Sequence, residues 1–146
     1  MTDKFDTFSG LLRAALGPGL VPADDLPGMF TDDIVFEFPF APEGLPTKFE
    51  GRDALTGHLA KLGPLLSLGE MELHAVYPSG DTVIAEFSCK GRGVQTGLPY
   101  DQIYVSVITL RDGRIARYRD YWNPLVVLAA LGGADAANAT FGGAGS

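Results

Sequence analysis

Four strand-length segments follow one another in the second half of the chain, and they restrict the fold more than any other feature. They span residues 70–77, 82–90, 100–110 and 114–122 and are rich in β-branched and aromatic residues. Short turns separate them, and the last turn contains an Asp-Gly pair typical of a β-hairpin. Strands joined by such turns pair antiparallel. We therefore expect an antiparallel sheet in this half.

The first half of the chain has helical periodicity instead. A helix is predicted over 5–16, where Phe and Leu recur at the spacing of one face, and a second helix over 52–62. Between them, 34–38 is predicted as a strand, and the three prolines in 39–46 exclude a regular element. A closing helical segment is expected over 124–131. Helices followed by a run of strands are typical of an α+β domain whose helices cover one sheet face.

Length and composition predict one globular domain with a short tail. The chain has 146 residues, of which 46% are hydrophobic, as is usual for a single folded domain. Residues 1–131 carry the predicted elements. Residues 132–146 are almost entirely Gly, Ala and small polar residues. They cannot bury enough apolar surface to offset the entropy that they would lose on becoming ordered. We expect that tail to be mobile.

Charge and cysteine content limit the partners and the location. A net charge of −7 without any basic run argues against nucleic acids and anionic membranes as partners. Cys89 is the single cysteine, so an intrachain disulfide is excluded, which fits a reducing compartment. The N-terminus lacks the parts of a secretion signal, and no apolar run is long enough to span a bilayer. We expect a soluble, cytoplasmic protein.

Three segments carry a resemblance to a known family. They are Phe38-Pro39-Phe40-Ala41-Pro42 leading into the stretch 49–55, then 110–115, and finally Tyr118-Arg119-Asp120-Tyr121-Trp122-Asn123-Pro124-Leu125. Together with the order of elements, they resemble the nuclear transport factor 2-like superfamily. They are most similar to its SnoaL-like group, which includes polyketide cyclases, limonene-epoxide hydrolase and the phenazine biosynthesis A/B proteins. The resemblance implies a cone-shaped, curved antiparallel sheet packed on N-terminal helices around an apolar pocket.

Several catalytic residues of these relatives are missing from this chain. Phe38 stands where ketosteroid isomerase has its base, and the first helix has no tyrosine to donate to an oxyanion. Phe87 and Cys89 stand where limonene-epoxide hydrolase has two of its three polar residues, and Asp120 matches the third. The phenazine A/B pattern is matched by His58 and by the acid Asp120, but its serine one turn after the histidine is replaced by a leucine.

Strand alternation indicates which side chains face the pocket. Side chains on a strand point alternately to the two faces, so Asp120 points opposite to its neighbours Arg117 and Arg119. We assign to the interior Tyr118, Asp120 and Trp122 together with Gln102, Tyr104 and Ser106. A carboxyl among aromatic rings has its pKa raised by desolvation, which suits a general acid or base near neutral pH.

Each candidate residue has a structural alternative. Asp120 is the predicted proton carrier, with the alternative of a carboxylate bonded to a tyrosine or a backbone N–H. His58, on the pocket side of the second helix, is the predicted partner, although a lone histidine among leucines is more often a core residue. Tyr104 and Tyr118 are candidate oxyanion donors or simply wall residues. The predicted substrate contacts are Tyr118, Trp122, Gln102, Ser106, Phe36 and Phe38.

The remaining polar residues offer no further chemistry. Cys89 is predicted to be an inert thiol within a strand, and His74 to lie on the solvent side. Two histidines on separate elements give no metal-ligand spacing, and no phosphate-binding glycine loop occurs. We expect neither a metal nor a cofactor.

Three functional hypotheses follow. The first is a cofactor-free isomerase, cyclase or dehydratase acting on a small, apolar, carbonyl-bearing or cyclic substrate. The second is a non-catalytic small-molecule binding protein with the same pocket. The third is a pure dimerisation domain, which predicts a cavity filled by side chains. A homodimer is expected through the outer sheet face, where Val105, Val107 and Tyr121 otherwise leave an apolar patch in water.

Overall fold

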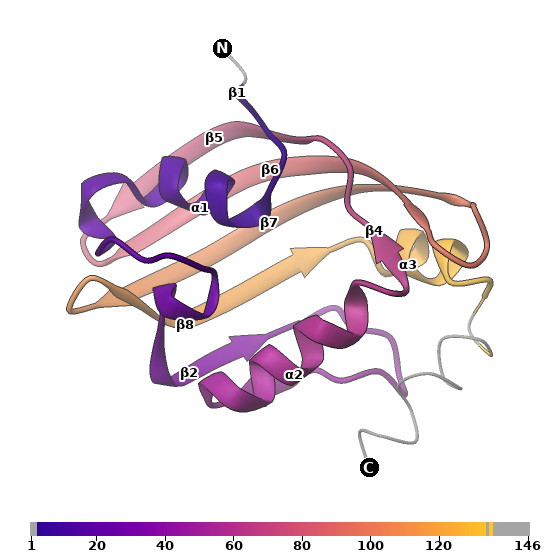
Figure 1. Ribbon diagram of the computed structural model, residues 1–146, viewed down its shortest axis with the longest axis horizontal. Helices are drawn as coiled ribbons and strands as arrows, with labels where there is room; N and C mark the ends of the chain where they lie inside the picture. Colours follow the sequence, from indigo (N-terminus) through magenta and orange to yellow (C-terminus); the bar gives the residue numbers. More distant parts are fainter. Residues whose placement is uncertain (1–2, 134, 136–146) are drawn as a thin grey trace.

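The four predicted strands of the second half form the centre of one curved sheet (Figure 1). The computed structural model describes residues 3–133 and 135, and the predicted tail lies mostly outside this range. The central strands are β5 (Met71–Ser79), β6 (Thr82–Gly93), β7 (Pro99–Arg111) and β8 (Arg114–Trp122). They pair antiparallel with their chain neighbours, as predicted. Asp112 and Gly113 turn β7 into β8 with positive φ angles of 54° and 81°, as a tight two-residue hairpin requires.

The sheet is mixed rather than wholly antiparallel. Strand β2 (Phe30–Glu37) lies parallel to β8. The paired segments are about 80 residues apart, and no turn motif in the sequence predicts that they pair. It starts before the predicted strand and ends just ahead of Phe38. The order of the main path is β1-β5-β6-β7-β8-β2-β3, with β1 and β3 at its two ends, so the curved sheet does not close.

Three very short strands were not predicted. They are β1 (Asp3–Phe5), β3 (Lys48–Glu50) and β4 (Leu66–Ser67). Two or three residues are too few for a period to show, and each strand exists because a longer neighbour supplies its hydrogen bonds. The first helix consequently begins later than predicted, after Thr7, whose side chain accepts a hydrogen bond from the backbone N–H of Gly10.

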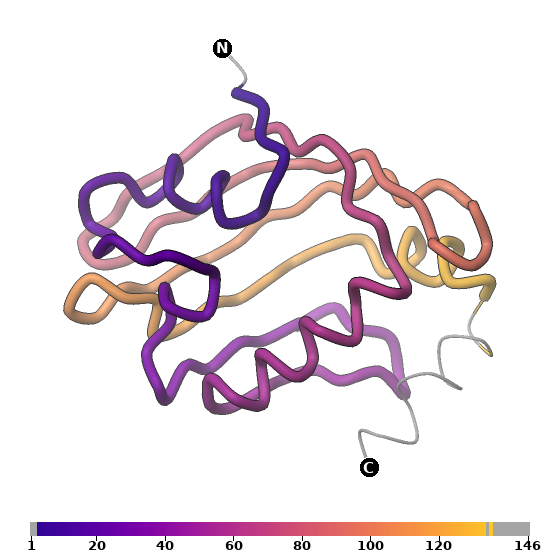
Figure 2. The backbone as a smooth tube through the Cα atoms, viewed as in Figure 1, coloured from indigo at the N-terminus to yellow at the C-terminus, as the bar shows by residue number. Residues whose placement is uncertain are grey.

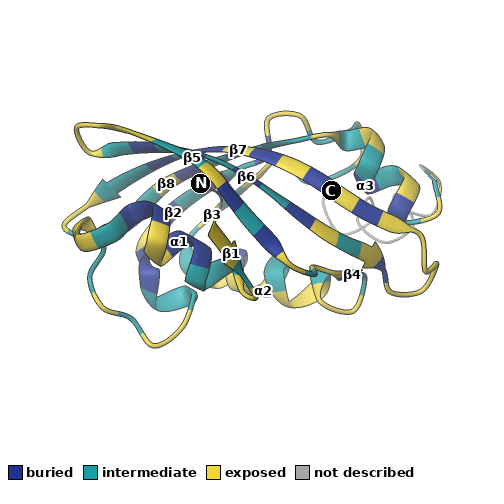
Figure 3. Cartoon of the chain, turned by 90° about the horizontal axis from the view of Figure 1, so that it is seen from above, coloured by how far each residue is buried: buried dark blue, intermediate teal, exposed yellow. Residues whose placement is uncertain are grey.

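Helices α1 (Phe8–Leu16) and α2 (Arg52–Leu62) lie on the same side of the sheet (Figures 1 and 3). Helix α1 packs on β5 and β6, and α2 packs on β2 and β3. The third helix, α3 (Pro124–Ala130), follows β8 directly and contacts β7. Two short 3-10 turns, η1 (Gly17–Gly19) and η2 (Pro27–Met29), connect α1 to β2. The proline-rich stretch 39–46 contains no helix or strand, as predicted.

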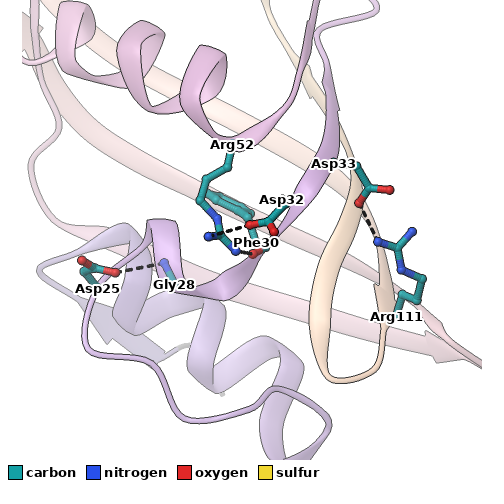
Figure 4. Close-up of polar contacts among 7 residues, drawn as sticks. All are labelled: Asp25, Gly28, Phe30, Asp32, Asp33, Arg52 and Arg111. Atoms are coloured by element: carbon teal, nitrogen blue, oxygen red, sulfur yellow. Dashed lines mark hydrogen bonds and ion pairs between the residues drawn. The ribbon is translucent and has the colours of Figure 1, made fainter.

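Arg52 ties the start of α2 to the start of β2. Its guanidinium donates to the backbone carbonyl of Phe30 and pairs with Asp32 at 2.8 Å (Figure 4). Asp33, next along β2, pairs instead with Arg111 at the β7–β8 hairpin. Figure 2 follows the same chain path, with α2 running beside β2. These contacts fix α2 relative to the sheet and therefore fix the position of His58.

The core lies between the inward sheet face and the helices. Strands β6, β7 and β8 bury alternate residues, as the period of two requires. A register shift between Thr109 and Leu110 marks a β-bulge, which lets Ile115 and Tyr118 both point inward although they are three residues apart. Among the described residues, no helix is long and apolar enough to cross a membrane.

Candidate active site

A cavity of about 350 Å³ lies between the inward face of the sheet and helices α1 and α2. Its size is within the range of sites that bind small molecules. The cavity is not filled by side chains, contrary to the expectation for a pure dimerisation domain. Most of the lining is aliphatic or aromatic. The lining side chains that carry hydrogen-bonding groups are His58, Tyr100, Tyr104, Asp120 and Trp122.

Asp120 is the acidic residue of the cavity lining. It lies on β8, is 9% exposed and faces inward, as strand alternation predicts. Burial raises its pKa from 3.8 to about 7, and a hydrogen bond from Ser106 offsets only part of that increase. A carboxyl with this pKa is present in both protonation states at neutral pH. It can therefore accept a proton and return it.

A chain of hydrogen bonds holds the Asp120 carboxyl from behind. The Tyr118 hydroxyl donates to Ser106 Oγ at 2.7 Å, and Ser106 donates to Asp120 Oδ1 at 3.2 Å. Both donors are fully buried, and neither is among the residues that line the cavity. They face inward as predicted, but the geometry suits them to orienting the carboxyl rather than to contacting a substrate.

Gln102 also faces inward without lining the cavity. Its amide donates to the backbone carbonyl of Asn123 at 3.0 Å, and its Oε1 accepts from the Asn123 N–H at 2.9 Å. Both bonds join β7 to the corner where β8 leads into α3. Gln102 therefore does not lie where the predicted substrate contact requires. It stabilises the turn from β8 into α3, next to Trp122.

The arginines beside Asp120 lie on the other face of the sheet. Arg117 and Arg119 both pair with Glu37, at 3.0 and 3.5 Å. This agrees with the expectation that they project away from the pocket. In the described part of the chain, no salt bridge reaches Asp120, so desolvation acts on its charge without a compensating cation.

His58 reaches the cavity from α2. Its ring stacks on Phe49 at a centroid distance of 4.2 Å and lies 5.5 Å from the ring of Phe38. Burial, with a smaller effect of Lys61, lowers its pKa from 6.5 to about 4. The imidazole is therefore neutral at pH 7. In that form one ring nitrogen donates and the other accepts.

Tyr100 and Tyr104 form a pair of hydroxyls in the cavity lining. Their oxygens are 2.8 Å apart, and the two residues are 4% and 7% exposed. Burial raises the pKa of both phenols. The sequence analysis identified Tyr104 but missed Tyr100. The signal was present, because Tyr100, Gln102, Tyr104 and Ser106 alternate along one face of the same strand.

The aromatic wall matches the predicted residues in part. Phe36, Phe38 and Trp122 line the cavity, as expected for substrate contacts. Phe36 also stacks on Tyr118, with ring centroids 4.3 Å apart and an interplanar angle of 7°. The loop and helix residues Phe8, Leu45, Pro46 and Leu62 also line it and were not predicted as site residues.

Cys89 and His74 lie as the sequence indicates. Burial raises the pKa of the Cys89 thiol, which keeps it protonated and unreactive. His74 is exposed on β5, with its Nε2 at 2.8 Å from Ser88 Oγ. Within the described ranges, no group of three or more His, Cys, Asp or Glu side chains could hold a metal ion.

Comparisons with known proteins agree on the family. Residues 19–118 match the model of the SnoaL-like domain. The uncharacterized protein YesE of Bacillus subtilis is 51% identical over 107 residues, covering 72% of this chain and 73% of that protein. An uncharacterized PhzA/B-like protein of Pseudomonas aeruginosa is 39% identical over 110 residues, covering 75% and 78%.

A solved structure supports the same assignment. A candidate isomerase from Bacillus subtilis superimposes with a TM-score of 0.73 at 44% identity, covering 84% of this chain and 87% of that one. More distant structures share only the fold. They include a candidate SnoaL-like polyketide cyclase from Mesorhizobium loti at 22% identity and a TM-score of 0.60, and an LEH-like epoxide hydrolase from M. tuberculosis at 19% identity and a TM-score of 0.57. These likenesses show the fold alone, so the reaction must be argued from the site.

Proposed function

The chain belongs to the SnoaL-like family, and from this premise we propose that it is an acid–base enzyme of the isomerase, cyclase or dehydratase type. Its substrate is a small, largely apolar, carbonyl-bearing or cyclic compound. One observation carries the proposal: a buried carboxyl with a pKa of about 7 faces an apolar cavity. Burial without a cation disfavours the ionised carboxylate, so a carboxyl at this position costs stability rather than adding to it.

The simplest step available to Asp120 is proton transfer at a carbon next to a carbonyl. The carboxylate takes the proton, the C–H bond breaks, and its electron pair moves toward the carbonyl oxygen to give an enolate. Protonated Asp120 then returns the proton to the same or another carbon. No atom is lost and no oxidation occurs, so the step requires no cofactor.

His58 serves this step as a neutral group. With its pKa lowered to about 4, the imidazole stays uncharged through the pH range in which Asp120 titrates. It lines the same cavity as Asp120 and assists it there as a neutral hydrogen-bonding group. A neutral imidazole beside an apolar wall does not attract anionic substrates.

The second candidate is a non-catalytic binding protein with the same ligand class. The observation in its favour is that Phe38, Phe87 and Cys89 stand where relatives have catalytic polar groups. The cavity would then hold its ligand by apolar contact alone, and Asp120 would only adjust affinity.

Exchange of α-protons for deuterium separates the two candidates without knowledge of the natural substrate. We would incubate 1-indanone, 2-tetralone and cyclohexenone in D₂O with the wild type and with Asp120→Asn, and follow the α-proton signals by NMR. General acid–base catalysis contributes about 10²–10⁴-fold, and Asp120→Asn should lose that factor while still binding the ketone.

The matched control is Asp101→Asn, an exposed acid on β7. It should exchange like the wild type. A ketone that binds to the wild type without faster exchange than in buffer would contradict the enzyme proposal and favour the binding protein. Equal exchange by Asp120→Asn would exclude Asp120 as the proton carrier.

A further inference from the structure

We propose that the Tyr100–Tyr104 pair is the subsite for the substrate's carbonyl oxygen, so that the ligands are uncharged ketones, esters or lactones and not carboxylic acids. This rests on the proposed function in one respect, that the cavity binds a carbonyl compound. It adds a third polar group to the cavity, separate from Asp120 and His58.

The position of the pair is the first support. Tyr100 and Tyr104 are four residues apart on β7, so both rings project from the inward face into the cavity lining. Tyr104 is further held by stacking on Phe87, at a centroid distance of 4.7 Å and an interplanar angle of 14°. The hydroxyls are thus placed by rigid strands rather than by a loop.

Counting protons is the second support. Two neutral phenols carry two hydroxyl protons, and the single bond between them at 2.8 Å uses one. Two other polar contacts involve the pair in the described structure. A hydrogen bond from the Gln102 side chain lowers the pKa of Tyr100, so the amide is the donor and uses no phenolic proton. Cys89 Sγ lies 3.9 Å from the Tyr104 hydroxyl. A thiol sulfur at that distance is a weak acceptor. One phenolic proton is therefore available to an acceptor atom in the cavity.

The chemistry of the donor set selects the acceptor. Burial keeps both phenols protonated, so they offer an uncharged donor. Among residues 3–133 and 135, no lysine or arginine lines the cavity to neutralise a carboxylate, and Asp120 would repel one. An uncharged carbonyl oxygen satisfies the free donor and leaves no buried charge unpaired.

The register of β7 and β8 places this subsite beside the proton carrier. Tyr104 pairs with Trp122 and Ser106 pairs with Asp120, so Tyr104 and Asp120 are diagonal neighbours on the inward face. Diagonal neighbours of this kind lie about 7–8 Å apart between Cα atoms. A carbonyl held by the tyrosines therefore leaves carbons a few bonds away from it facing Asp120.

The test compares a ketone with an isostere that lacks the oxygen. We would measure the affinities of 2-acetylnaphthalene and 2-isopropenylnaphthalene, and the infrared C=O stretch of the bound ¹³C-labelled ketone. The wild type should prefer the ketone by about 3–10-fold, the value of one net neutral hydrogen bond, and should shift the stretch to lower frequency. The double variant Tyr100→Phe/Tyr104→Phe should lose both effects.

Single variants and a control make the test specific to the pair. Tyr100→Phe or Tyr104→Phe alone removes one hydroxyl but leaves the other phenolic proton free, so each should keep a shifted C=O stretch. Tyr77→Phe, an exposed tyrosine on β5, is the matched control and should behave like the wild type. Circular dichroism and melting temperature of each variant check that it is folded.

Each result decides the proposal. No ketone preference in the wild type, or a preference and a shifted stretch that survive in the folded double variant, overturns the subsite. Failure of the proposed enzyme is a different result: proton exchange is then absent although the C=O shift depends on the tyrosines. If α-proton exchange depends on Asp120 but the shift of the C=O stretch does not depend on the tyrosines, the subsite is refuted and the role of Asp120 stands.

Discussion

Strand β8 places two neighbouring charged residues in opposite environments. Arg119 lies on the outer face of the sheet and pairs with Glu37, while Asp120 lies on the inner face with Ser106 as its hydrogen-bond donor. On the outer face opposite charges meet near water, where such pairs contribute little. On the inner face a single acid meets aromatic rings, and its pKa rises to about 7. A local alternation of period two therefore separates ion pairs near water from a buried acid whose pKa is raised.

The largest effect is expected when the inner charge is removed. The folded-state pKa of Asp120 lies above the ordinary 3.8, so the stability linked to this group is full below about pH 4, declines as pH rises and is lowest above pH 7. Three pKa units correspond to about 4 kcal/mol. Asp120→Asn keeps an acceptor for Ser106, and its free energy of unfolding should exceed that of the wild type by up to about 4 kcal/mol at pH 8. The difference should nearly vanish at pH 4.

Urea unfolding at the two pH values measures this difference. If Asp120→Asn lowers the free energy of unfolding by about 2 kcal/mol or more at pH 8, the carboxylate holds a buried hydrogen-bond network. That result would contradict the view that the inner charge is destabilising.

The next effect concerns the outer face, which we propose is covered by a second copy of the chain. On β7, Ile103 is 71% exposed and Val105 is 37% exposed. Glu86 on β6 is the register partner of Val105, and Arg119 on β8 is that of Val107, so an acidic residue and a basic residue flank the apolar row on opposite sides. A two-fold rotation about this row brings Arg119 of one copy toward the strand that carries Glu86 in the other.

Ile103→Glu tests this proposal. The substitution places two like charges in an isologous interface, and the dimer dissociation constant should rise about 100-fold or more, as for residues central to an interface. Sedimentation equilibrium measures it. Leu98→Glu changes an exposed apolar residue in the loop before β7. It is the control and should have the same dimer dissociation constant as the wild type. A monomeric wild type would refute the proposal.

A smaller effect is expected at His58. Its folded-state pKa of about 4 lies below the ordinary 6.5, so stability is full above pH 6.5 and falls as the pH decreases toward 4, because the unfolded chain takes up the proton first. After allowance for screening of this partly exposed ring, the loss is roughly 1–2 kcal/mol. His58→Gln should remove that loss. Melting temperatures of both proteins between pH 4 and pH 8 check it, and parallel curves would show that His58 is not the cause.

The smallest effect is expected for the outer ion pairs. In a single copy of the chain, as in the Ile103→Glu background, Glu37→Gln should change the free energy of unfolding by about 0–1 kcal/mol, less at high salt, because there Glu37 and its arginines are near water. Unfolding in low and high salt measures it. A cost comparable to that at Asp120 would show that the outer charges are as tightly coupled to the fold as the inner one.

The sequence was most informative where a period or a turn is local. Alternation along two hairpin-linked strands placed Asp120, Tyr104 and Trp122 on the inner face and Arg119 on the outer one, as the structure shows. The parallel pairing of β2 with β8 could not be predicted, because it joins distant segments without a turn signal.

Strand alternation also could not predict which inward-facing side chains reach the cavity. Tyr118, Ser106 and Gln102 share the inner face with Asp120, yet they do not line the cavity, because packing rather than alternation decides which side chains reach it. His58 was placed correctly because a helix face needs only local spacing. Tyr100 was missed although its spacing to Tyr104 follows the same rule.

The proline-rich stretch between β2 and β3 has a consequence for how this protein can diverge. Leu45 and Pro46 from that stretch line the cavity, whereas the carboxyl and the tyrosine pair come from β7 and β8. Loops tolerate exchange better than the strands they connect. Insertions and replacements in 39–46 can therefore alter the shape of the cavity over generations, while the polar residues on the strands are left unchanged.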